Sequence, residues 1–312
     1  MKNIFFLALW LYSSSLACAQ SIAFTENELY PEGIAYSKQL QTFFVSSMHY
    51  GKIGKVDKKG NYTVFADDPE LISSVGLLLD EQREVLYACV SDPGTAVKTS
   101  ANTQRKVAKV IAFSLSTGSK KFTVDLAKLH PESSHFANDL TIDTEGNLYV
   151  TNSFTPVIYK VTPQGKTTTW ATSPLWEGEG FNLNGITYHP AGFILAMKMN
   201  SGDLFKIDLK KPANITQVKV AKMVGGDGLV LNDDKTLVVI ANESGKLYKV
   251  ESQDSWQSGE VVATKQAVMS FPTTGVQVEG KNYILNAKLN EIFDEKTPNT
   301  SDFLIQEVVF EK

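Results

Sequence analysis

The chain has very little cysteine. Only two of its 312 residues are cysteines, Cys18 and Cys89, and Cys18 lies in an N-terminal segment that we expect to be removed. A single remaining cysteine excludes an internal disulfide, so packing and hydrogen bonds must hold the fold. Cys89 follows an apolar, strand-like pattern, which favours a buried, unreactive thiol over a nucleophile.

The chain also lacks clusters of basic residues and long hydrophobic runs. Its formal net charge is −4, with 30 Lys and Arg residues scattered along the sequence, which argues against nucleic acid as a partner. Beyond the N-terminal segment no apolar run approaches the roughly 20 residues that a membrane-spanning helix needs. We therefore expect a protein without a membrane span, acting as a monomer on a small molecule.

The first 19 residues have the features of a secretory signal peptide. Lys2 precedes an apolar run at residues 4–12, and Ala17-Cys18-Ala19 matches an A-x-A cleavage site. A lipoprotein signal built on Cys18 is the weaker alternative, because it needs an apolar residue at position 15, which is a serine. The sequence predicts a signal peptide at 1–19, one domain at 20–312, and a secreted or periplasmic location.

A repeated unit organises the rest of the chain. The stretch FANDLTIDTEGNLYVTNS, residues 136–153, alternates apolar and polar residues on both sides of a Gly-containing turn, as a β-hairpin does. Five similar stretches occur elsewhere, and the residue equivalent to Asp139 in them is Gly33, Gly76, Gly185, Gly228 or Gly275. In chain order, these six equivalent positions are separated by 43, 63, 46, 43 and 47 residues. Six units of this size predict an all-β, six-bladed β-propeller with four antiparallel strands per blade. A β-sandwich is the alternative, but sandwiches do not usually repeat a whole unit.

Both ends of the chain carry strand-like segments. Residues 21–26 precede the first unit as a lone strand, and residues 303–312 supply another at the far end. Pairing strands from both termini in one blade would remove the open edges of the ring. We therefore predict a ring closed by strands from both termini.

Four polar residues occupy the same position, immediately before the first strand of their repeats: Glu32, Asn138, Asn184 and Asp227. First strands line the axis of a propeller, so these side chains are expected to converge there. Two carboxylates and two amide oxygens suit a hard divalent cation such as Ca²⁺, with Zn²⁺, Mn²⁺ or Mg²⁺ as other possibilities. Each of these residues, taken singly with the residue after it, could be an ordinary turn dipeptide such as Asn-Gly or Asp-Gly. Four such residues at the same phase of a repeat favour a metal site.

The motifs YPEGIAY, FANDLTID, LNGITYH and GGDGLVL resemble those of the senescence marker protein/gluconolactonase family, particularly its uncharacterised secreted and plant-type members. The resemblance spans nearly all of the chain after the signal peptide. It implies a calcium-dependent hydrolase propeller in which Glu32, Asn184 and Asp227 hold the metal and Asn138 contacts substrate or a metal-bound water. Sugar lactonases of this family have an arginine at the position of Phe136, so a substrate less polar than an aldonolactone is expected here.

If the protein is an enzyme, we expect water to attack a lactone or ester carbonyl polarised by the metal. The resemblance favours Asp227 as the base that receives the proton of that water. Asp139 and His135 are further candidates from their position alone.

The long step in the repeat places a polar insertion at residues 91–109. The loop after the second strand of a blade emerges on the face where the first strand begins, so it is expected beside the proposed ligands. It is either a substrate-selecting lid or a plain surface loop. In the first case Asp92, Phe136 and Phe181 would line the substrate pocket.

Two classes of function follow from the sequence. The first is a secreted, divalent-metal-dependent hydrolase of a lactone or related ester. The second is a non-catalytic propeller that binds a small molecule or peptide at a channel mouth plugged by the metal. A condensing role like that of strictosidine synthase shares the fold, but that family lacks this full set of metal ligands.

Overall fold

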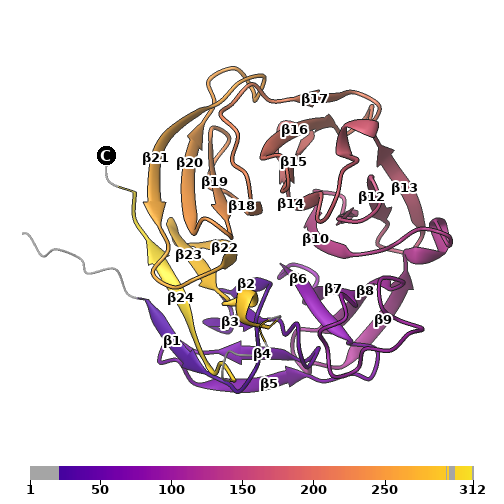
Figure 1. The fold of residues 1–312 in the computed structure, drawn as a ribbon, viewed down its shortest axis with the longest axis vertical. Helices are drawn as coiled ribbons and strands as arrows, with labels where there is room; N and C mark the ends of the chain where they lie inside the picture. The colour runs from indigo at the N-terminus through magenta and orange to yellow at the C-terminus, as the bar shows by residue number, and fades with distance from the viewer. Residues whose placement is uncertain (1–20, 293, 295–298, 311–312) are drawn as a thin grey trace, which may run out of the picture.

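The period-two repeats form six antiparallel sheets of four strands, arranged in a ring about a common axis (Figure 1). The computed structural model describes residues 21–292, 294 and 299–310, and the predicted signal peptide at residues 1–19 lies outside them. This architecture confirms the predicted six-bladed β-propeller. Within the described part of the chain, no helix has the length and apolar character needed to cross a bilayer.

In the first five blades the strands follow one another in chain order, from the axis outwards. They are β2 (Ile34–Ser37), β3 (Thr42–Val45), β4 (Ile53–Val56) and β5 (Tyr62–Ala66); β6 (Ser73–Asp80), β7 (Val85–Ser91), β8 (Ala108–Ser114) and β9 (Lys120–Asp125); β10 (Ala137–Ile142), β11 (Leu148–Asn152), β12 (Val157–Val161) and β13 (Thr167–Thr172); β14 (Leu183–His189), β15 (Phe193–Lys198), β16 (Asp203–Asp208) and β17 (Ile215–Gln217); and β18 (Gly226–Leu231), β19 (Thr236–Ala241), β20 (Lys246–Glu251) and β21 (Glu260–Gln266).

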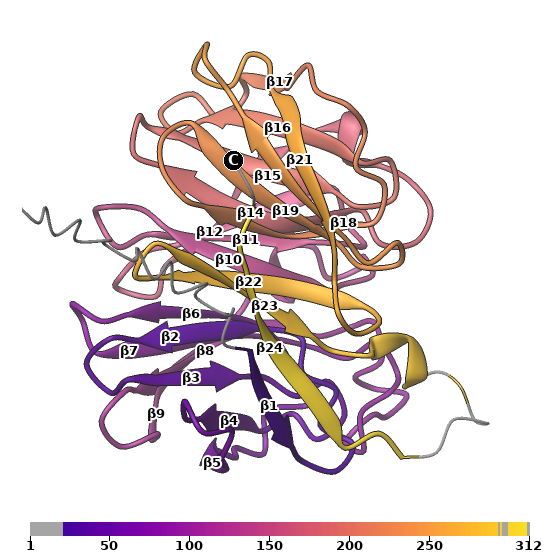
Figure 2. The same ribbon diagram turned by 90° about the vertical axis from the view of Figure 1, so that its left-hand side faces the viewer.

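The sixth blade takes strands from both ends of the chain, as predicted. Its order is β22 (Pro272–Val278), β23 (Lys281–Asn286), β24 (Asp302–Val308) and then β1 (Ile22–Thr25) as the outermost strand. Figures 1 and 2 show indigo β1 beside yellow β24, and the two pair antiparallel over four residues. Residues near the two termini thus hold the ring closed.

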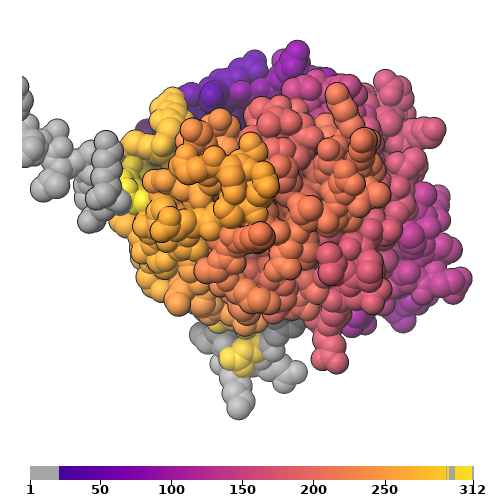
Figure 3. Space-filling view, turned by 90° about the horizontal axis from the view of Figure 1, so that it is seen from above, coloured from indigo at the N-terminus to yellow at the C-terminus, as the bar shows by residue number. Residues whose placement is uncertain are grey.

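Three short 3-10 helices complete the described elements: η1 (Ala127–Leu129), η2 (Pro174–Trp176) and η3 (Leu289–Glu291). Apolar faces of neighbouring blades pack against each other and bury large side chains such as Trp176, Trp256 and Tyr149. Seen from the edge in Figure 3, the pink and orange residues of blades four and five pack side by side. Packing between blades therefore fixes where each innermost strand meets the axis.

The innermost strands share an irregularity where the repeats carry their polar residues. Strand pairing shifts between Ala137 and Leu140 in β10, between Leu183 and Ile186 in β14, and between Gly226 and Leu229 in β18. Bulges of this kind redirect side chains and recur beside functional sites. Asn138, Asn184 and Asp227 therefore lie in strand bulges, and the turn interpretation of these residues is wrong.

Close approach of neighbouring blades explains the glycine that follows most of these polar residues. A Cβ atom on Gly185 would lie 2.1 Å from the backbone oxygen of Asp227, and one on Gly33 would lie 2.3 Å from that of Val75. Neighbouring innermost strands therefore approach too closely at the axis for any larger residue. In these repeats glycine is required by packing between blades.

Candidate functional site

The four predicted ligands lie together at one end of the axis. Glu32, Asn138, Asn184 and Asp227 all line a single cavity of about 260 Å³, although they come from four different blades. Their side chains are almost completely buried, with exposures of 7%, 2%, 4% and 4%. Phe136 and Phe181, which the sequence predicts as substrate-binding residues, line the same cavity.

Neighbouring polar groups orient two of these side chains. The Nδ2 group of Asn138 donates to Ser153 Oγ at 2.9 Å, which leaves Asn138 Oδ1 without a hydrogen-bond partner. Asn242 Nδ2 donates to Asp227 Oδ2 at 3.1 Å. Ser153 and Asn242 come directly after the second strands of their blades. Neither residue was predicted from the sequence, although a polar residue after the second strand recurs in several repeats.

Among the described residues, no Lys or Arg forms an ion pair with Glu32 or Asp227 in the cavity. Glu32 Oε2 is buried and unpaired, like Asn138 Oδ1. Burial raises the pKa of Glu32, and the nearby charges of Asp227 and Asp139 raise it further. Burial also raises the pKa of Asp227, although the hydrogen bond from Asn242 opposes this. The buried carboxylates thus repel one another, and a cation between them would relieve the repulsion.

This arrangement fits a hard divalent cation. Carboxylate and amide oxygens are the usual ligands of Ca²⁺, and here one of each is buried without a hydrogen-bond partner. The two carboxylates would balance the charge of the ion. Among the residues that the structure describes, no group of three or more His, Cys, Asp or Glu side chains has a metal-binding arrangement. A metal at this site would therefore depend on the amide oxygens of Asn138 and Asn184 as well as on Glu32 and Asp227.

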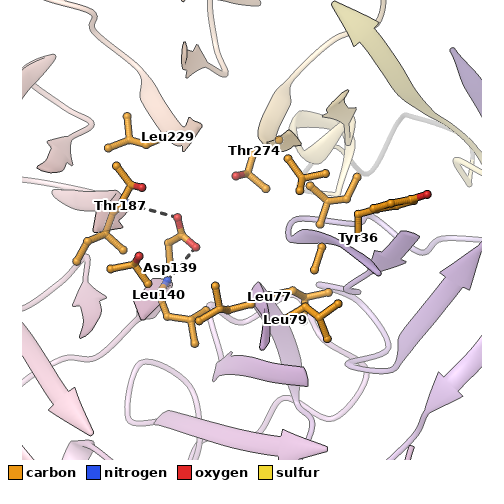
Figure 4. Close-up of a pocket in the computed structure, with 15 residues that line it drawn as sticks. Tyr36, Leu77, Leu79, Asp139, Leu140, Thr187, Leu229 and Thr274 are labelled. Atoms are coloured by element: carbon orange, nitrogen blue, oxygen red, sulfur yellow. Dashed lines mark hydrogen bonds between the residues drawn. The ribbon is translucent and has the colours of Figure 1, made fainter. Parts of the chain in front are cut away.

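Asp139, a candidate base, lies in a different cavity. Figure 4 shows its carboxylate among residues of the innermost strands, in a space of about 210 Å³ that all six blades line. Its oxygens accept hydrogen bonds from the backbone N–H groups of Leu140 at 2.8 Å and Ile186 at 3.4 Å. Burial raises the pKa of Asp139 to about 7. The structure thus places Asp139 beside the site but not among the residues that line the first cavity.

Asp139 occupies the position that is glycine in the other five repeats. A Cβ atom on the neighbouring Gly76 would lie 2.8 Å from Asp139 Oδ1. Because the adjacent blade has a glycine there, the axis has room for one carboxylate. Asp139 therefore projects into space that side chains do not enter in the other repeats.

The structure does not bring His135 to the site. The ring of His135 is 1% exposed and does not line the cavity. Its Nε2 atom lies 3.0 Å from the backbone oxygen of His130, and Asn152 Nδ2 lies 3.1 Å from its Nδ1 atom. Both ring nitrogens are engaged in the packing of this loop, so the geometry does not support His135 as a base.

Asp92 also lies away from the cavity, contrary to its predicted place in the pocket wall. Its carboxylate accepts hydrogen bonds from Gly94 N, Thr99 Oγ1 and Thr103 Oγ1, all within the insertion. The adjacent Pro93 lines the cavity instead. Asp92 organises the insertion, and the insertion reaches the ligand face as expected.

Several residues that line the cavity were not identified from the sequence. They come from loops at the ends of strands in five of the six blades: Met48, Pro93, Met199, Asn242, Glu243, Phe271, Leu289 and Asn290. Leu289 belongs to η3, in the connection between β23 and β24. No periodic signal marks such loop residues, because their meeting depends on closure of the ring.

Comparisons with known proteins support the fold. No protein-family model and no curated protein sequence matches the chain. Among solved structures, the chain is similar to the major allergen Mala s 1 of Malassezia sympodialis, with a TM-score of 0.75 and 19% identity over 93% of this chain and 96% of that one. It is also similar to a luciferin-regenerating enzyme, with a TM-score of 0.64 and 14% identity over 91% of this chain and 94% of that one.

A gluconolactonase from Xanthomonas campestris is a third similar structure, with a TM-score of 0.63 and 14% identity over 93% of this chain and 90% of that one. At these identities the similarity shows a shared fold. One fold hosts many functions, so a shared fold alone does not assign one. The structural neighbours thus include gluconolactonase-type propellers, in agreement with the resemblance seen in the sequence motifs.

Proposed function

We propose that this protein is a divalent-metal-dependent hydrolase that acts on a lactone or related ester. One observation carries the proposal: oxygen-bearing side chains from four blades meet at the base of one cavity, where Glu32 Oε2 and Asn138 Oδ1 are buried without partners. Leaving such groups unpaired is costly, and proteins rarely do so without a ligand. The similarity of the fold to gluconolactonase-type propellers agrees with this proposal.

Glu32, Asn184, Asp227 and Asn138 would hold the cation. When bound, it would polarise the substrate carbonyl and favour ionisation of a nearby water. Ca²⁺ is the ion that the all-oxygen donor set suits best. The hydrogen bond that Asn138 Nδ2 donates to Ser153 Oγ fixes the amide group and leaves its Oδ1 atom available to the cation.

Residues that line the cavity would carry out the proton transfer and exclude water. Asp227 receives a proton from water as the water oxygen attacks the carbonyl carbon, and Asn242 steadies the carboxylate during this transfer. The ring C–O bond then breaks, and the proton passes to the departing oxygen to give a hydroxy acid. Phe136 and Phe181 line the cavity and restrict access of bulk water.

The test measures bound metal and hydrolysis on one preparation of the protein. We expect stoichiometric Ca²⁺, turnover that stops when a chelator removes it, and loss of both in Asp227→Asn. Asp233→Asn is the matched control, because Asp233 lies on an exposed turn of the same blade. A protein that binds no divalent metal would refute the proposal.

A second outcome would favour the other class of function. Bound metal without turnover of any lactone or ester would indicate a non-catalytic propeller that binds a small molecule at its metal-plugged mouth. We also propose that residues 1–19 direct export. N-terminal sequencing of the exported protein should then begin at Gln20, and a mature protein that retains residue 1 would contradict this.

A further inference from the structure

The wall of the cavity differs sharply in character from its base. Besides the four oxygen-bearing residues, six apolar side chains line the space: Met48, Phe136, Phe181, Met199, Phe271 and Leu289. The rings of Phe136 and Phe181 meet edge to face with centroids 5.1 Å apart. Phe154 packs against both at 5.5 and 5.0 Å, which holds this part of the wall in place. A bound molecule would therefore meet mostly hydrocarbon away from the four oxygen-bearing residues.

Hydrogen-bond donors for a polyhydroxylated ligand are scarce in this wall. None of the described residues that line the cavity is Lys, Arg or His. Apart from the four predicted ligands, its polar lining residues are Asn242, Glu243 and Asn290. Sugar hydroxyls buried against Met and Phe side chains would lose hydrogen bonds to water without replacing them. The wall thus disfavours a sugar lactone and favours an alkyl-bearing one.

The cavity adjoins a larger outer groove. This groove, of about 550 Å³, lies between the connections of blades five and six and is lined by Ser244, Gly245 and residues 266–270. Glu243, Phe271 and Asn290 line both spaces. Val268 in the groove is 69% exposed. These three residues thus form the boundary that a ligand longer than the inner cavity would cross.

Phe271 stands at the boundary between the two spaces in an unusual backbone conformation. Its φ is 54°, in the left-handed region that is unfavourable for a bulky residue. Buried polar groups hold the preceding segment, since Gln306 Oε1 accepts from Val268 N and Asn286 Oδ1 accepts from Met269 N, both at 3.0 Å. The fold thus imposes a fixed position on Phe271, and such imposed strain is characteristic of functional sites.

We propose that the substrate is a lactone or ester with a long alkyl chain, whose carbonyl lies at the oxygen-lined base while its chain passes Phe271 into the outer groove. Phe271 is then the residue that determines which chain lengths are accepted. This inference rests on the proposed hydrolase function for turnover. Binding of the chain can be tested without it.

The first experiment compares hydrolysis of three γ-lactones with methyl, butyl and octyl chains, with glucono-δ-lactone as the polar reference. Each buried methylene should raise kcat/KM about fourfold, so we expect at least a tenfold rise from methyl to butyl and a further rise to octyl. Equal rates along the series, or faster hydrolysis of the sugar lactone, would overturn the proposal.

Phe271→Trp tests the passage directly, because a larger ring with the same backbone preference narrows the boundary. We expect kcat/KM for the octyl lactone to fall at least tenfold more than that for the methyl lactone. Phe271→Gly, which suits the left-handed backbone, should keep the octyl lactone as a substrate and relax the dependence on chain length. Phe310→Trp, a partly buried ring outside both spaces, is the control. Unchanged selectivity in both Phe271 variants would refute the assignment.

Non-hydrolysable γ-lactams with the same three chains separate this inference from the proposed function. Calorimetric titration should show affinity rising with chain length in the wild type and the octyl gain lost in Phe271→Trp. If the lactones are not hydrolysed but the lactams follow this order, the hydrolase proposal fails and the assignment of the alkyl-chain site stands. If lactones are hydrolysed but affinity is independent of chain length, the inference fails alone.

Discussion

Phe24 tests how the ring is closed. It lies in β1, is 3% exposed, and packs against Phe303 of β24 with ring centroids 5.7 Å apart. Phe24→Ala removes this ring from a well-packed contact, and such truncations cost about 3–5 kcal/mol. Because β1 is held by only four paired residues, we expect the substitution to release the strand and open the sixth blade.

The assay is thermal unfolding followed by circular dichroism. In a domain of this size each kcal/mol shifts the melting temperature by about 2 °C, so Phe24→Ala should melt about 6–10 °C below the wild type. Thr25→Ala is the matched control, because Thr25 belongs to the same strand but faces solvent. It should melt within about 1 °C of the wild type, as surface substitutions usually do. A Phe24→Ala melting temperature as close as that would refute the account of ring closure.

Three further predictions concern the site and the surface. Ca²⁺ at a hundred times its dissociation constant should stabilise the wild type by about 2.7 kcal/mol but leave the melting temperature of Asp227→Asn unchanged, and equal shifts in both would contradict the metal site. Gly185→Ala should lower both the melting temperature and Ca²⁺ affinity, because its Cβ would lie 2.1 Å from Asp227 O; unaltered Ca²⁺ affinity would argue against this. Hydrogen bonds from Lys109 and Lys120 lower the pKa of Glu70 to about 2, so their stabilisation is present above about pH 4 and is lost as pH falls through about 2. Glu70→Gln should therefore reduce stability at pH 7 by less than about 1 kcal/mol, because the pair is partly exposed, and should reduce it less at pH 2, where much of Glu70 is protonated; chemical denaturation at both pH values measures the difference.

The architecture could be predicted because it depends on local, repeated signals. Alternation of apolar and polar residues follows from the pleat of a strand, and six copies at a similar spacing leave few alternatives to a ring of blades. The shared phase of Glu32, Asn138, Asn184 and Asp227 was visible for the same reason. Phe136 indicated an apolar wall, and the structure places its ring in that wall.

The remaining parts of the site depend on contacts between segments far apart in the chain. Asp92 and His135 are close in sequence to residues that line the cavity, but their side chains form hydrogen bonds within their own loops. The sequence does not reveal the conformation of these loops. Asp139 enters the axis because the adjacent Gly76 makes room for it. Such placements follow from how one blade packs on the next.

The sequence by itself therefore determined the strand period, the number of blades and the four oxygen-bearing residues that share one phase, because all three follow from a local pattern and its repetition. Only the tertiary structure decided which side chains surround those four residues. Met48, Phe271 and Leu289 come from different blades and meet only when the ring closes. No local propensity favours the left-handed backbone of Phe271, and the segment before it is held across the sixth blade by hydrogen bonds from Val268 to Gln306 and from Met269 to Asn286.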